Sequence, residues 1–259
     1  MRKGLLLLVC LIGMVVANAQ SYTIYPIPQR TTEGSGTVEL TQTINVVCGA
    51  GIGHVTKARI QEVLEGAGYV YQLGESASSE LTNLYVGVAG SGDVADTYAT
   101  SQGISKEVFT EAPNRFDSHV MQIADGNIVV LGNGERSEYY AFATLEQILD
   151  QAAGAALHEV TYEDYSHCQW RGAIEGFYGN PYSVDAHCSL FEFFKRFKMN
   201  VFIYAPKMDP YHLGYWTEEY PTEITEEQRR MGWITQDDVR RMAETARACN
   251  VHFVWAAHP

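Results

Sequence analysis

The feature of the sequence that most constrains the fold is a short apolar run that recurs three times in the last third of the chain and ends each time in glycine, proline or a charged residue. The copies occupy residues 171–179, 201–207 and 251–259. The segments between them have the apolar spacing of helices, and strands that alternate with helices predict βα units and a parallel sheet. Functional side chains in such folds lie where the strands end. The residues expected at this rim are Glu175, Gly176, Lys207 and His258.

Residues 1–19 have the pattern of a secretory signal peptide. Arg2 and Lys3 precede an apolar run over residues 5–16, and Ala19 ends a small-x-small cleavage pattern. The run is too short to span a bilayer comfortably. We therefore expect the protein to be exported, to the periplasm or the extracellular space, after cleavage behind Ala19.

The charge and the cysteines exclude several classes of function. Without the two basic residues of the signal peptide, 16 basic residues face 31 acidic ones, a net charge of −15. Such a surface repels polyanions, which argues against nucleic acids and anionic membranes as partners. The cysteines left in the mature chain show no zinc-ligand spacing and are expected to be small buried hydrophobes: Cys48, Cys168, Cys188 and Cys249. No metal or organic cofactor is expected.

Residues 20–165 are expected to form a supporting domain with a small α+β layer. Its predicted strands cover residues 38–40, 44–48, 84–89 and 157–162, and its predicted helices cover residues 57–64 and 135–150. The pair Asp125-Gly126 between two further apolar runs predicts a β-hairpin, because both residues tolerate positive φ. We expect residues 90–113 to be a long polar connection and Glu138 to lie on a solvated helix start.

Residues 166–259 are expected to contain two complete βα units and a third strand. Ser183 is a predicted N-cap, and Thr235 with Asp238 forms a capping signature. The stripe expected to face the sheet from the first helix is Leu190, Phe193, Phe194 and Phe197. The neighbours Asp237 and Asp238 are expected to serve the helix dipole, on the side of the sheet where a barrel has no chemistry, and receive no catalytic role.

The three parallel strands raise a problem of closure. A barrel needs about eight strands, and an exposed third strand would present an unpaired apolar edge. The sequence is therefore expected to be a fragment, or a product cut short. The loop over residues 208–232 is long and rich in aromatic side chains, which suits either a binding platform or packing.

Several motifs follow one another in this last segment. They are Arg-Gly-Ala-Ile-Glu-Gly-Phe-Tyr-Gly at 171–179, Lys-Met-Asn at 198–200, Tyr-Ala-Pro-Lys at 204–207, Asp-Pro-Tyr-His at 209–212, and Phe-Val-Trp-Ala at 253–256. In this order they resemble glycoside hydrolase family 84, whose members are β-N-acetylglucosaminidases and include relatives of O-GlcNAcase and bacterial hyaluronidase-like proteins. Residues 20–165 resemble, more weakly, the α+β domain that precedes the barrel in this family and in family 20 hexosaminidases.

The resemblance implies an α/β fold in which an N-terminal α+β domain precedes the first three strands of a truncated (β/α)8 TIM barrel. It also implies removal of terminal β-linked N-acetylglucosamine by substrate-assisted retaining catalysis, an exception to the usual pair of nucleophile and acid. In the family two consecutive aspartates at the end of strand four act on the substrate acetamide and the leaving group. Those catalytic residues are expected beyond the end of this chain, so the chain alone should be inactive.

The resemblance carries over only the sugar-binding part of the rim. Gly176 matches a glycine whose carbonyl accepts a bond from a sugar hydroxyl, and Lys207 matches a lysine that donates to sugar hydroxyls. Phe177 and Tyr178 match residues of the pocket floor, although rim packing is an equal interpretation. The residues expected to support these from behind are Asp209, His212 and Glu175, and the last of these is expected to bond Arg171 or the backbone.

Two other hypotheses stay open. The chain could be a non-catalytic, truncated glycan-binding product that uses Gly176, Lys207 and the aromatic loop. It could also begin a family 18 or family 20 type enzyme, which would need a different acidic motif on strand four. The expected partner in each case is a glycan or glycoprotein that contains N-acetylglucosamine.

Overall fold

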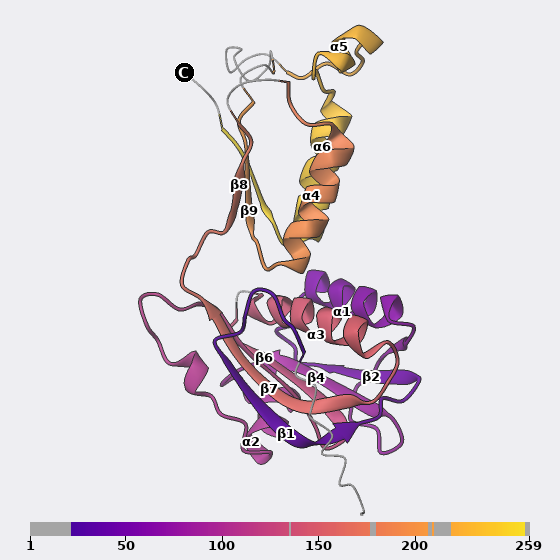
Figure 1. The fold of residues 1–259 in the computed structure, drawn as a ribbon, viewed down its shortest axis with the longest axis vertical. Helices are drawn as coiled ribbons and strands as arrows, with labels where there is room; N and C mark the ends of the chain where they lie inside the picture. Colours follow the sequence, from indigo (N-terminus) through magenta and orange to yellow (C-terminus); the bar gives the residue numbers. More distant parts are fainter. Residues whose placement is uncertain (1–21, 135, 177–179, 207–208, 210–218, 257–259) are drawn as a thin grey trace, which may run out of the picture.

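The computed structural model describes residues 22–134, 136–176, 180–206, 209 and 219–256. Figure 1 shows a large twisted sheet with helices on both faces, and a smaller unit of strands and helices attached to one side of it. Within these ranges no helix is long and apolar enough to cross a membrane.

The large sheet is mixed and has seven strands. They are β1 (Arg30–Val38), β2 (Thr43–Cys48), β3 (Val70–Leu73), β4 (Thr82–Val88), β5 (Phe116–Ala124), β6 (Asn127–Gly132) and β7 (Leu157–Ser166). The spatial order is β1-β7-β5-β6-β4-β2-β3. Neighbours from β6 to β3 run parallel, whereas β5, β7 and β1 pair in antiparallel fashion. The predicted α+β layer is thus present, with one strand more, β3, than the pattern of apolar runs indicated.

Alternate residues of the central strands face two separate cores. The first core lies under helices α1 (His54–Gly66) and α3 (Ala141–Ala152) and contains Val46 and Leu84. The second lies under helix α2 (Val94–Ser101) and contains Val47 and Tyr85. This change of face at every residue is the period of a strand. The predicted hairpin is confirmed, with Asp125 and Gly126 at φ 50° and 74° between β5 and β6.

Three predictions for this domain are wrong. The connection expected over residues 90–113 contains α2 and the 3₁₀ helix η1 (Glu107–Phe109). Helix α2 is short and buries small residues, so its apolar signal is weak, but Asp93 caps it by accepting a bond from the backbone N–H of Asp96. The strand expected at residues 38–40 is instead the end of β1, an exposed edge strand. The strand β3 was not expected, because three of its four side chains are exposed.

Glu138 is buried rather than solvated. It lies in the 3₁₀ helix η2 (Ser137–Tyr140), is 2% exposed, and accepts a bond from the hydroxyl of Thr56 at 3.2 Å. Burial raises the pKa of this carboxyl. The cysteine prediction also fails at one position, because Cys168 is exposed while Cys249 is buried.

The smaller unit repeats the order strand, helix, strand. Its elements are β8 (Gly172–Ile174), α4 (Val184–Arg196), β9 (Val201–Tyr204), α5 (Glu226–Arg230), α6 (Gln236–Ala248) and β10 (His252–Trp255). The three strands are parallel in the order β10-β9-β8. The predicted caps are confirmed: Ser183 accepts from the N–H of Ala186, and Thr235 and Asp238 form a reciprocal capping box.

The helices cover one face of this three-stranded sheet (Figure 1). From β9, Phe202 and Tyr204 point into the core shared with α4 and α6. The predicted stripe of α4 is confirmed at Phe194, which is buried, and at Leu190, which packs against the core, but it is wrong at Phe193, which is 49% exposed and packs on Phe197. The buried stripe is Val184, His187, Phe191 and Phe194. This buried stripe includes a histidine, which a search for apolar residues alone does not identify.

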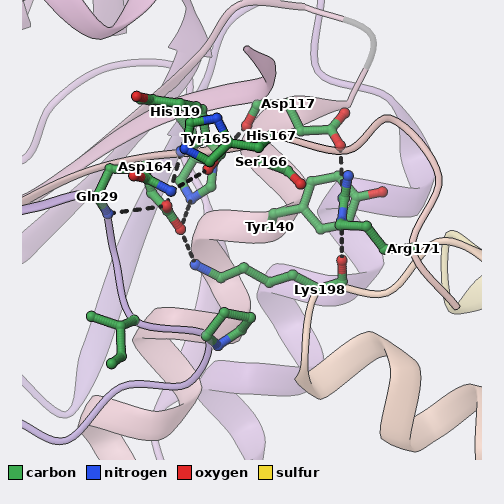
Figure 2. A pocket seen from close by; sticks show the side chains of 12 residues that line it. Gln29, Asp117, His119, Tyr140, Asp164, Tyr165, Ser166, His167, Arg171 and Lys198 are labelled. Atoms are coloured by element: carbon green, nitrogen blue, oxygen red, sulfur yellow. Dashed lines mark hydrogen bonds and ion pairs between the residues drawn. The ribbon is translucent and has the colours of Figure 1, made fainter. Parts of the chain in front are cut away.

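Two ion pairs join the units on either side of a cavity of about 170 Å³ (Figure 2). Lys198 Nζ, from the turn before β9, donates to Asp164 Oδ2 of β7 at 2.7 Å, and both side chains are 8% exposed. Arg171 Nη2, just before β8, donates to Asp117 Oδ2 at 2.7 Å. Each pair has one residue in the large sheet and one in the smaller unit, so the two pairs connect the units. We call this region, with the cavity between the pairs, the junction.

His119 lies beside the Lys198–Asp164 pair and is neutral at pH 7. Its Nδ1 lies 2.8 Å from the carbonyl of Asp117, and its Nε2 lies 3.7 Å from Asp164 Oδ2 (Figure 2). Burial, with a further contribution from the positive charge of Lys198, lowers the pKa of His119 to about 4. Burial alone would raise the pKa of Asp164, but Lys198 holds it below its ordinary value.

Replacing Lys198 with methionine should lower the free energy of unfolding by about 3–5 kcal/mol, because the carboxylate of Asp164 would stay buried without its partner. Chemical denaturation of the purified chain measures this. The matched control is Arg240→Met, which removes an exposed pair with Asp237 and should change stability by less than about 0.5 kcal/mol. Equal effects of the two substitutions would contradict the assigned role of the junction.

The folded protein should lose stability as the pH falls from about 6.5 toward 4. The pKa of His119 is lower in the folded state than in the unfolded state, so the folded state binds fewer protons between these two pH values. The contribution of neutral His119 to stability is therefore fully present only above the pKa of the unfolded state. A shift of this size corresponds to a loss of about 3 kcal/mol. The variant His119→Asn should show a smaller slope in denaturation curves between pH 7 and 4. The control variant His54→Asn, at an exposed histidine, should keep the full dependence of stability on pH. If His119→Asn showed the same dependence as this control, His119 would not be the group responsible.

Candidate functional site

The carboxyl ends of β8, β9 and β10 meet at one rim, as predicted. The described residues there include Glu175 and Gly176 after β8, Asp209 after β9, and Trp255 at the end of β10. Five other predicted residues lie outside the described residues: Phe177, Tyr178, Lys207, His212 and His258.

Glu175 is a buried carboxylate whose two oxygens both accept hydrogen bonds. Its Oε1 accepts from the backbone N–H of Tyr182 at 2.7 Å, and its Oε2 from Nε2 of His187 at 2.8 Å. Glu175 is 6% exposed and His187 is 1% exposed. Of the two partners expected for Glu175, the backbone is therefore correct, whereas Arg171 instead bonds Asp117 and nearby carbonyls.

Gly176 faces the side of the sheet that the helices leave open. Ile174, two residues before it, is 55% exposed, and alternate residues of a strand share a face. A Cβ added at Gly176 would meet no heavy atom of the described residues within 4 Å. Among the described residues, therefore, none blocks this position, and the absence of a side chain permits close contact with the backbone.

Asp209 is the most completely buried charged residue of the rim, with 0% of its surface exposed. Its Oδ2 accepts from the hydroxyl of Tyr204 at 2.9 Å and from the hydroxyl of Tyr220 at 2.7 Å. Trp255 Nε1 donates to the same Tyr220 hydroxyl at 3.1 Å. Burial, followed by the charge of Asp209, raises the pKa of both tyrosines. This network ties the end of β9 to the end of β10.

The position of Asp237 and Asp238 was predicted incorrectly. Helix α6 leads from the end of β9 to the start of the parallel strand β10, so it begins at the same end of the sheet as the rim (Figure 1). The capping role is nevertheless correct: Asp238 Oδ2 accepts from the N–H of Thr235 at 2.9 Å, and the side chain of Asp237 is 83% exposed. The pair lies in the outer helix layer.

The described rim can recognise a ligand, but its own acid–base chemistry is limited. The carboxylates of Glu175 and Asp209 each accept hydrogen bonds from at least two donors among the described residues. In the described part of the chain, no three His, Cys, Asp or Glu side chains converge as metal ligands would. Sequence reasoning did not identify His187 or the role of Tyr220. The available signal for the former was a histidine at helical spacing between Val184 and Phe191.

Two family matches together cover nearly all of the chain after residue 20. Residues 171–259 match the family described as beta-N-acetylglucosaminidase, and residues 21–165 match the family described as glycosyl hydrolase family 20, domain 2. Protein O-GlcNAcase of Rattus norvegicus and that of Mus musculus are each 30% identical to the chain over 88 residues, which are 34% of this chain and 8% of theirs.

Solved structures agree with these matches. The structure of CpGH84D has a TM-score of 0.82 and 35% identity over 93% of this chain and 38% of that chain. The X-ray structure of Flavobacterium johnsoniae chitobiase has a TM-score of 0.59 and 15% identity over 90% of this chain and 34% of that chain, a likeness of fold alone. The chain therefore spans well under half the length of these relatives and resembles the N-terminal part of glycoside hydrolase family 84.

Replacing Asp209 with leucine should lower the free energy of unfolding by about 2–4 kcal/mol, because two tyrosine hydroxyls would lose their buried acceptor. Replacing it with asparagine should cost less, since the amide oxygen still accepts. Urea denaturation of both variants provides the measurement. If leucine is tolerated as well as asparagine, the network does not stabilise the rim.

Proposed function

We propose that the chain is the N-terminal part of an enzyme that removes terminal β-linked N-acetylglucosamine. The proposal starts from two findings: through residues 21–165 the chain belongs to the family described as glycosyl hydrolase family 20, domain 2, and its later part resembles glycoside hydrolase family 84. The observation that carries the proposal is Gly176 at the carboxyl end of a parallel strand, with no described residue packed against it and with the doubly hydrogen-bonded carboxylate of Glu175 directly before it. Sites in barrels of this type lie at that end of the strands.

The rim provides the part of the site that holds the sugar. Gly176 accepts a hydrogen bond from a sugar hydroxyl through its carbonyl, and Lys207 donates to sugar hydroxyls through its ammonium group. Phe177 and Tyr178 form the floor under the ring. Asp209 and His212 support the segment that contains Lys207. Support for these roles comes from the family match over residues 171–259.

The reaction is substrate-assisted hydrolysis with retention. The acetamide carbonyl of the substrate attacks the anomeric carbon, while one carboxylate polarises the acetamide N–H and its neighbour acts as acid and then as base. These two carboxylates belong to sequence that follows the third barrel strand and that this chain does not contain. Supporting this division, the chain covers 38% of the CpGH84D chain.

The protein acts outside the cytoplasm on glycans or glycoproteins. Support comes from the signal-peptide pattern of residues 1–19 and from the acidic mature chain, which suits a neutral glycan better than a polyanion. No cofactor takes part in the proposed reaction.

A polypeptide that contains this chain and the rest of the barrel should release the chromophore from a chromogenic β-N-acetylglucosaminide, while the 259-residue chain should not. Lys207→Ala in the longer polypeptide should raise KM about tenfold or more, because a charged donor to the sugar is lost. Lys57→Ala, in helix α1, serves as the matched control and should leave KM unchanged.

The outcomes separate the hypotheses. No hydrolysis by the longer polypeptide would refute the enzymatic proposal. Binding of N-acetylglucosamine without hydrolysis would favour a non-catalytic glycan-binding protein in its place. Equal KM values for the Lys207 and Lys57 variants would remove Lys207 from the site.

A further inference from the structure

We propose that His187 is a positioning residue for the sugar site, which acts by holding Glu175 and through it the carbonyl of Gly176. This inference rests on the proposed function and adds to it a residue of helix α4 that is outside the rim.

Glu175 is held at both ends of its carboxylate. The backbone N–H of Tyr182, in the turn before α4, donates to Oε1, and the imidazole of His187, in the first turns of α4, donates to Oε2. A buried carboxylate with two charge-assisted hydrogen bonds has little freedom to rotate, since any other rotamer would leave its charge unpaired. The side chain of Glu175 is therefore fixed against the helix.

Glu175 anchors the backbone next to Gly176. The parallel ladder continues past β8, because the N–H of Glu175 donates to the carbonyl of Ile203 at 3.0 Å. Ile174 is in register with Ile203, so Glu175 lies level with Tyr204 and on the same face, toward the helices. By strand alternation the Cα of Gly176 then has its substituent side on the open face. The bonds made by Glu175 toward the helix layer thus hold the backbone directly before Gly176, and with it the carbonyl of Gly176, in a fixed position.

The histidine itself cannot shift, because aromatic rings surround it. Its ring centroid lies 5.4 Å from that of Phe202 and 5.6 Å from that of Tyr204, both in edge-to-face geometry, and 6.1 Å from that of Tyr182. His187 donates through Nε2, and its Nδ1 has no hydrogen-bond partner in the described part of the chain. Among the described residues, the imidazole therefore makes a single hydrogen bond, and its partner is Glu175.

The proposal makes a kinetic prediction for the longer, active polypeptide. Leucine at position 187 keeps much of the volume but lacks the donor, so Glu175 would turn away and the carbonyl of Gly176 would lose its direction. A contact made equally in the bound substrate and the transition state appears in KM, so His187→Leu should raise KM about five- to tenfold and leave kcat within about twofold. His187→Gln, whose amide N–H can reach Glu175, should restore most of the loss.

The matched control is Phe194→Leu. Phe194 is buried in the same helix at 2% exposure, two turns further from the rim, and contacts neither Glu175 nor Gly176. This variant should lower the thermal stability without raising KM. Should His187→Leu fail to fold, Glu175→Gln carries the same test, because an amide has one oxygen for the two donors, and its KM should also rise several-fold.

The outcomes are distinct. If the wild-type polypeptide is active and the KM of His187→Leu matches that of Phe194→Leu, the positioning role is wrong and the proposed function stands. If glutamine does not improve on leucine, the hydrogen bond is not the cause and the role is also wrong. If the wild-type polypeptide does not hydrolyse the substrate, the proposed function fails and this inference fails with it.

Discussion

The guanidinium group of Arg171 makes the contacts on which the placement of the rim depends. This residue stands directly before β8, and its Nε and Nη atoms donate to the carboxylate of Asp117 and to the carbonyls of Lys198 and Cys168. It also lies 5.2 Å from the ring of Tyr140. One side chain thus fixes the start of β8 and the turn before β9 to the large sheet. The strands β8 and β9 are only three and four residues long, so a displacement of the backbone at their start would also displace the rim at their ends.

The three-stranded sheet divides its two faces between stability and binding. The face toward α4 and α6 holds the packed aromatic core, including Phe202, and there the carboxylate of Glu175 finds donors. The opposite face shows half-exposed apolar residues such as Ile174 and Val254 and the open backbone of Gly176. Charge is therefore satisfied on the side that excludes water, while the side open to a ligand presents backbone and apolar surface.

The sequence predicts the elements whose signals are local. The apolar runs at residues 44–48 and 84–89, the Asp125-Gly126 turn and the Thr235 capping box each depend on a few neighbouring residues, and these are confirmed. Two of the failures involve contacts distant in sequence. Glu138 is buried with its carboxyl bonded to Thr56, and the buried face of α4 includes His187, which bonds Glu175. Neither partner can be identified from spacing along the chain, whereas the family motifs did indicate which strand ends carry the candidate site.

The measurement that tests the central claim most directly is a crystal structure of the longer polypeptide with N-acetylglucosamine bound. The account predicts that the sugar lies on the open side of the β8–β10 rim, with a hydroxyl within hydrogen-bond distance, about 2.7–3.2 Å, of the carbonyl oxygen of Gly176. A sugar bound elsewhere, such as in the junction cavity beside Lys198, with Gly176 left free, would contradict the account.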